Sequence, residues 1–188
     1  MIIDIFKTSI FKTSIKNKEY INYFLNLLNI QKKFNYKKTI SNVGGFQSES
    51  LTTLDDVIKK NLFINPSLQY LKNFNKIYKI ELINFWINCN NKNDYNLLHN
   101  HPESNISGVY YIQAEKNSGR IVFQNGDLTK MNSINQHYFN DPNFYSRYFF
   151  SIKKFDLILF PSETFHYVEP SNSNEERISV AFNLSLKN

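Results

Sequence analysis

Residues 99–112 read HNHPESNISGVYYI and place two histidines shortly before an apolar segment. In an extended chain, residues two positions apart point to the same face, so the imidazoles of His99 and His101 can address one ion. Pro102 cannot continue a ladder of hydrogen bonds and fits the end of a strand. The stretch therefore predicts a strand end that carries a pair of metal ligands, followed by a further strand.

A third histidine, His166, follows the apolar run Phe155 to Phe160. It reaches the first pair only if the two strands lie close in space, which β-rich folds achieve readily. An isolated His-x-His pair is more often a surface or hydrogen-bonded feature than a ligand pair, but a third histidine at another strand end favours a metal site. His137 falls in a polar stretch, where exposure to solvent is expected.

The rest of the chain predicts helices first and strands afterwards. Apolar residues recur at helical spacing over 17–34, a second helix is expected after Leu51, and Pro66 can open a third. A polar stretch at 125–146 is typical of a loop over a binding site. Helices followed by strands predict a mostly β fold, a helix-backed antiparallel sandwich or barrel. The strands are expected at 78–87, 107–113, 120–124, 147–152, 155–160, 164–169 and 176–186.

Length and composition indicate one globular domain over residues 1–188, with 1–76 as mainly helical support and 77–188 as the β core with the metal site. The formal charge of +6 would suit an anionic partner, but the lysines are spread along the chain, so binding of nucleic acid is not favoured. Cys89 is the single cysteine, and neither a secretory signal nor a membrane span is apparent. A reducing, cytoplasmic setting follows.

Four segments together, HNHPESNISGVYYI, SGRIVF, LILFPSETFHYVEP and ERISVAFNL, resemble the iron(II)- and 2-oxoglutarate-dependent oxygenases. The resemblance covers roughly the last 110 residues and implies a double-stranded β-helix, the jelly roll that cupins share. The string His-x-His-Pro with Ser-Gly-Val-Tyr-Tyr is similar to a subfamily of marine bacteria and their phages, which implies the cytoplasm of a bacterium or of a phage-infected cell.

This resemblance implies that His99, His101 and His166 bind iron(II). The wider family uses His-x-Asp or His-x-Glu with a distal histidine, a triad that leaves positions for 2-oxoglutarate and dioxygen. Here His101 stands where the carboxylate is expected, so the site carries one negative charge fewer. A second register remains open, because His101-Pro102-Glu103 is itself His-x-Glu. Glu103 is therefore the alternative third ligand, or a residue that orients an imidazole.

The resemblance also implies a clamp for the far carboxylate of 2-oxoglutarate. Arg177 matches the arginine of the family, and a guanidinium meets carboxylate oxygens in pairs. Ser179 shares its face of the strand, and Tyr111 occupies a position that often donates its phenol to the same group. Asn183 and Trp86 are expected to face the pocket. Taken alone, Arg177 would be read as a surface partner of Glu175 or Glu176, and the tyrosines as ordinary strand residues.

The expected reaction is hydroxylation of an unidentified substrate by iron(II), 2-oxoglutarate and dioxygen. Two alternatives stay open: a cupin-like enzyme in which three histidines hold a metal without 2-oxoglutarate, and a non-catalytic jelly-roll module that binds a glycan or a nucleic acid. The substrate is either a small molecule or a macromolecule, a membrane is not expected as a partner, and a homodimer is compatible with the sequence.

Overall fold

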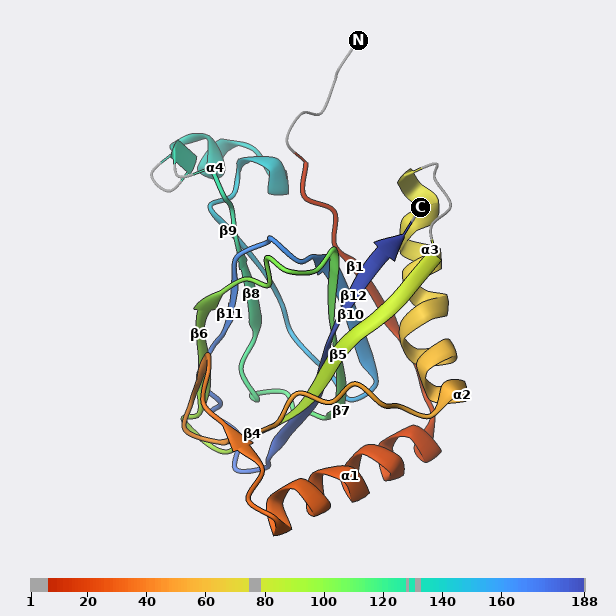
Figure 1. Cartoon of the computed structure of the whole chain (residues 1–188). Coiled ribbons are helices and arrows are strands. Elements are labelled where there is room, and N and C mark those ends of the chain that lie inside the picture. Colours follow the sequence, from red (N-terminus) through yellow and green to blue (C-terminus); the bar gives the residue numbers. More distant parts are fainter. Residues whose placement is uncertain (1–6, 75–78, 128, 131–132, 188) are drawn as a thin grey trace.

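The computed structural model describes residues 7–74, 79–127, 129–130 and 133–187. In these residues, strands form two antiparallel sheets that face each other (Figure 1). The larger sheet has seven strands in the order β1-β10-β7-β12-β5-β4-β2, and the smaller has five in the order β3-β6-β11-β8-β9. The mostly β fold with helices at its back is thus confirmed.

The strands lie close to the predicted ranges where the sequence carries apolar runs. They are β1 (Phe11–Ser14), β2 (Lys37–Lys38), β3 (Asn42–Val43), β4 (Phe46–Ser48), β5 (Lys79–Asn90), β6 (Tyr95–His99), β7 (Ile106–Gln113), β8 (Ile121–Gln124), β9 (Arg147–Phe150), β10 (Asp156–Pro161), β11 (His166–Val168) and β12 (Arg177–Lys187).

The helices differ from the prediction in one respect. Helix α1 (Lys18–Lys33) begins as expected, at Asn17, whose side chain accepts hydrogen bonds from two backbone N–H groups of the first turn. The second and third predicted helices form one continuous helical segment, with Pro66 in the first turn of α3 directly after η1. The segment comprises α2 (Asp56–Ile58), the π-helical η1 (Lys59–Ile64), α3 (Asn65–Leu71) and the short 3-10 turn η2 (Lys72–Phe74).

The predicted loop at 125–146 contains two short helical turns, α4 (Asn135–Tyr138) and η4 (Pro142–Phe144). The described residues of this segment project beyond the end of the small sheet, on the side of β8 and β9 (Figure 1). No helix in the described residues is long and apolar enough to cross a membrane.

The main hydrophobic core lies between the helices and the outer face of the large sheet. The rings of Phe63 in η1 and Phe182 in β12 stack with centroids 3.9 Å apart, and neither is exposed to solvent. A second cluster, which includes Tyr111, Phe123 and Phe160, fills part of the space between the two sheets. The rest of that space holds the polar residues described below.

The N-terminal part is more than a helical support. It supplies β1, β2 and β4 to the large sheet and β3 to the small one, so it extends both sheets. The division into residues 1–76 and 77–188 stays a prediction, and its boundary lies outside the described residues.

Candidate active site

The structure brings His99, His101 and His166 together. His99 ends β6, His166 begins β11, and the two are directly paired across these antiparallel strands. His101 lies two residues beyond β6, where its backbone N–H donates to the carbonyl of Ser162. One ring nitrogen from each histidine lies within 4.8 Å of those of the other two, a spacing that suits three ligands of one metal ion.

Backbone contacts set the tautomers of two of these histidines. The Nδ1–H of His99 donates to the carbonyl of Leu97 at 2.6 Å, and the Nδ1–H of His166 donates to that of Thr164 at 2.9 Å. In both cases Nε2 keeps its lone pair, which is the arrangement that orients an imidazole toward a metal. Ser41 lies beside this lone pair, with its Oγ 3.5 Å from Nε2 of His99.

Burial keeps all three imidazoles neutral. It lowers the pKa of His99, and burial together with the neighbouring His99 lowers the pKa of His101 to about 4 and that of His166 to about 3. The aromatic rings of Phe123 and Phe160 border His166 and contribute to its desolvation. Neutral imidazoles are the form that binds metal ions, so no proton has to leave the site at neutral pH.

Glu103, the alternative ligand, lies apart from this group. The cluster of potential ligand atoms contains the three histidines alone, whereas Glu103 is exposed and lines a second hollow next to His101. His137 is exposed in α4, as expected from its polar surroundings.

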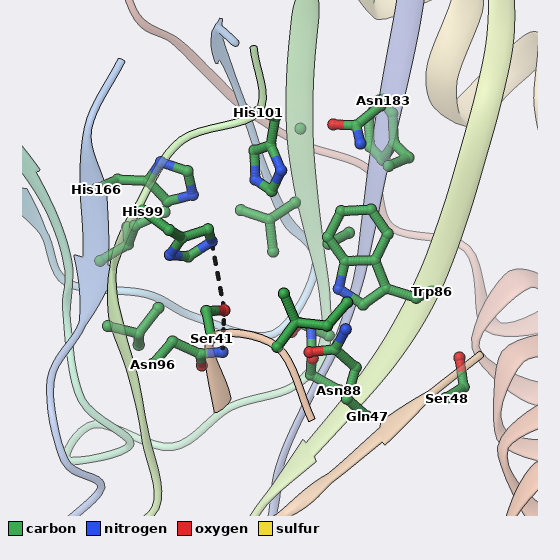
Figure 2. A pocket seen from close by; sticks show the side chains of 18 of the residues that line it. Ser41, Gln47, Ser48, Trp86, Asn88, Asn96, His99, His101, His166 and Asn183 are labelled. Atoms are coloured by element: carbon green, nitrogen blue, oxygen red, sulfur yellow. Dashed lines mark hydrogen bonds between the residues drawn. The ribbon is translucent and has the colours of Figure 1, made fainter. Parts of the chain in front are cut away.

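The histidines open into a cavity of about 340 Å³ between the two sheets. Figure 2 shows the three imidazoles on one wall, with Trp86, Asn88 and Gln47 across from them. Because its volume lies near the lower end of the range for small-molecule sites, the cavity suits a compact ligand.

Arg177 lies in this cavity wall and is almost wholly buried. Its Nη1 donates to the backbone carbonyls of Ser118 and Glu169, while its Nη2 is buried without a hydrogen-bond partner. Burial lowers the pKa of Arg177, but a guanidinium stays charged in proteins. The Asp94 carboxylate stabilises this charge electrostatically but is not hydrogen-bonded to Nη2, so a carboxylate in the cavity would supply the missing hydrogen-bond partner.

Tyr111 and Ser179 lie beside Arg177, as the sequence predicts. The two residues are paired across β7 and β12, and both line the cavity. Burial raises the pKa of Tyr111 far above neutrality, so its phenol is a hydrogen-bond donor, and in the described structure neither hydroxyl is paired.

Asn183 and Trp86 lie farther along the same wall. Asn183 is six residues from Arg177 on β12, which corresponds to roughly 20 Å in a strand, so the two cannot hold the same short dicarboxylate. The amide of Asn183 is bonded to Asn84 at 3.0 Å and accepts from Ser107 at 2.8 Å. Trp86 lies closer to the metal ligands, with its indole centroid 5.6 Å from the ring of His101.

Sequence reasoning missed several polar residues of the cavity, among them Ser41, Gln47 and Asn88. Asn88 follows Trp86 by two residues on β5, and this alternation was a usable signal. Gln47 and Ser41 come from the polar N-terminal segment and reach the cavity through strand pairings of β3 and β4 that the sequence pattern does not reveal.

Comparisons with known proteins agree with this geometry. Residues 84–183 match the family model described as "Putative 2OG-Fe(II) oxygenase". No sequence among the curated proteins matches the chain.

Solved structures share the fold at low sequence identity. A prolyl-4-hydroxylase from Pseudomonas putida superposes with a TM-score of 0.65 at 10% identity and covers 96% of this chain and 94% of its own. An oxidoreductase of the 2OG-Fe(II) oxygenase family from Burkholderia pseudomallei gives 0.61 at 12% identity, with 94% of this chain and 84% of its own covered. HygX from Streptomyces hygroscopicus, solved with nickel and 2-oxoglutarate, superposes with a TM-score of 0.60 at 9% identity. The match covers 95% of this chain and 82% of HygX. The family match spans more than half of the chain, which therefore belongs to the iron(II)- and 2-oxoglutarate-dependent oxygenases.

Proposed function

We propose that His99, His101 and His166 hold iron(II), that Arg177 holds 2-oxoglutarate, and that the chain hydroxylates a substrate admitted to the same cavity. The observation that carries this proposal is the buried, unpaired Nη2 of Arg177, which shares one cavity with three neutral imidazoles. Three nitrogen ligands on one side leave coordination positions free for a chelating co-substrate. The residues present therefore fit both groups.

When bound, iron(II) and 2-oxoglutarate would supply hydroxylation chemistry with dioxygen as the oxidant: one oxygen atom would enter the substrate and the other succinate, with release of carbon dioxide. The protein's part is orientation. Backbone carbonyls of Leu97 and Thr164 fix the rings of His99 and His166, and those of Ser118 and Glu169 fix the guanidinium of Arg177. Tyr111 can donate its phenol to the carboxylate that Arg177 neutralises.

The site has no carboxylate ligand among its described residues, so its charge differs from that of a two-histidine, one-carboxylate triad. Three neutral imidazoles leave the full charge of the cation to be balanced by co-ligands. We infer weaker iron binding in the absence of 2-oxoglutarate and a strong preference for anionic co-ligands. Glu103 is proposed as a surface residue of the entrance.

A reducing cytoplasm is proposed as the setting, because the single cysteine, Cys89, is buried and free. The 125–146 segment, which projects beside β9, is proposed as the cover for the substrate.

The test is an anaerobic titration of the protein with iron(II) and then 2-oxoglutarate, followed by visible absorption. We expect a charge-transfer band that Arg177→Ala weakens strongly and Arg147→Ala, an exposed arginine outside the cavity, leaves unchanged. Iron binding without a response to 2-oxoglutarate would favour the cupin-like alternative. Failure to bind iron would leave a non-catalytic module.

A further inference from the structure

The co-substrate clamp accounts for only part of the cavity's polar wall. One row of side chains crosses four neighbouring strands: Gln47 pairs with Asn88, Asn88 with Ser179, and Ser179 with Tyr111. All four are at most 9% exposed, and in the described structure none of their side-chain polar atoms has a hydrogen-bond partner. Tyr111 and Ser179 lie beside Arg177, whereas Gln47 and Asn88 lie on the β4 and β5 side.

Unpaired buried amides are costly, since each polar atom removed from water without a partner loses its hydrogen bonds to solvent. The Oδ1 of Asn88 is fully buried and unpaired. A ligand with hydrogen-bonding groups would satisfy this part of the wall.

The chemistry of the wall indicates an uncharged ligand. Apart from Arg177, Lys38 is the one charged residue among those found to line the cavity, and it pairs with Glu49 at 3.7 Å. No carboxylate lines the cavity in the described residues. A second ammonium would therefore be buried against neutral amides without a counter-charge, and a second carboxylate would find only Lys38, which is exposed and already paired with Glu49.

Trp86 adds a flat apolar surface between the amides and the metal ligands. Its indole lies beside His101, and Figure 2 shows it next to Asn88 on the wall that faces the histidines. In the described structure its Nε1–H donates to no partner, so it is available to a ligand. An aromatic face flanked by carboxamide donors and acceptors suits a ring whose edge carries hydroxyl, amide or imide groups.

We propose that the substrate presents a single uncharged ring with hydrogen-bonding edges to the metal, held by Trp86, Asn88 and Gln47. Sugar rings and nucleobases share this chemistry. The volume of about 340 Å³, part of which the co-substrate occupies, limits the inserted group to one ring. This inference rests on the proposed function, because it places the ring next to iron and 2-oxoglutarate.

The test uses the protein loaded anaerobically with iron(II) and 2-oxoglutarate. Binding of four probes is followed by ligand-observed NMR: methyl α-glucoside, 1-methylthymine, acetate and methylammonium. Each probe is measured with the parent protein, with Asn88→Leu and Gln47→Met, which keep the side-chain volume, and with Asn26→Leu on the exposed face of α1 as the matched control.

We expect at least one neutral ring to bind, and Asn88→Leu or Gln47→Met to weaken it about threefold to tenfold, as the loss of one neutral hydrogen bond does. Asn26→Leu should change nothing. Binding of the glucoside assigns a carbohydrate, and binding of 1-methylthymine assigns a nucleobase.

The proposal is overturned if neither ring binds, if a charged probe binds more tightly and loses that affinity in Asn88→Leu or Gln47→Met, or if the ring binds to both variants as well as to the parent protein. It is also overturned if Asn88→Leu weakens the binding of 2-oxoglutarate and leaves the binding of the ring unchanged, since the amide of Asn88 then binds the co-substrate. Absence of the charge-transfer band in the parent protein is a separate failure, that of the proposed function.

Discussion

The two walls of the cavity differ in whether their polar atoms already have hydrogen-bond partners within the protein. On the histidine wall, backbone carbonyls occupy one nitrogen of His99 and of His166, and aromatic rings exclude water around His166. On the facing wall, Asn88, Ser179 and Tyr111 have unpaired polar atoms, and Arg177 keeps one free donor. The first wall is set in its working geometry by the fold, and the second depends on ligands to complete it.

The largest effect is expected on the histidine wall. His166→Ala removes a ligand that no other described residue of the cluster can replace, so iron(II) affinity should fall by at least about 100-fold, the upper end of what loss of a supporting partner costs. Anaerobic competition against a chromogenic chelator measures this affinity. An unchanged affinity would remove His166 from the metal site.

The facing wall is tested through Gly119, which adopts a φ of +86° next to the clamp. A Cβ at this position would lie 2.3 Å from the carbonyl oxygen of Glu169 and 2.7 Å from Nη1 of Arg177. Gly119→Ala should therefore displace the guanidinium of Arg177 and lower the affinity for 2-oxoglutarate about tenfold, while the affinity for iron(II) is retained.

The matched control is Gly126→Ala, because a Cβ there meets no atom within 4 Å. Titration of the charge-transfer band compares the two variants. Equal affinities in both would show that Arg177 does not depend on its two carbonyl partners.

A smaller effect distinguishes the two faces of β5. Cys89 lies between Asn88 and Asn90 and points away from the cavity, where its thiol donates to Glu176 at 3.1 Å and accepts from Lys32 at 3.2 Å. Burial and the Glu176 carboxylate raise the pKa of Cys89 to about 11.

The thiol is therefore protonated at neutral pH, and we expect negligible labelling by a thiol reagent in the folded protein and full labelling after denaturation. Rapid labelling of the folded protein would mean that this face of β5 opens readily.

The last prediction is that one substitution has no effect on iron binding. Glu103→Gln should leave iron affinity unchanged, because Glu103 is exposed and outside the histidine cluster. The chelator competition used for His166→Ala measures it, and a large loss would restore the His-x-Glu register.

Sequence patterns anticipated the histidine wall better than the facing one. His99 and His101 shortly precede the apolar strand β7, and His166 shortly follows the apolar strand β10, so a clear local pattern marks their places in the sequence. Gln47 lies on β4, a strand of three residues with polar neighbours, and enters the cavity only because β4 pairs with β5. Such pairing is a tertiary effect that overrides weak local preference.

The helical segment from Asp56 to Phe74 shows a similar limit. The sequence predicts a separate helix that starts at Pro66, but the preceding turn is a π-helix that leads directly into α3. Proline fits either arrangement, and packing of Phe63 on Phe182 fixes the continuous one.

The most direct test of the central claim is a crystal structure of the anaerobic complex with iron(II) and 2-oxoglutarate. The account predicts one metal ion bound by nitrogens of His99, His101 and His166, and a carboxylate of 2-oxoglutarate on Nη2 of Arg177. A metal bound through Glu103, or a co-substrate that leaves Arg177 unpaired, would contradict it.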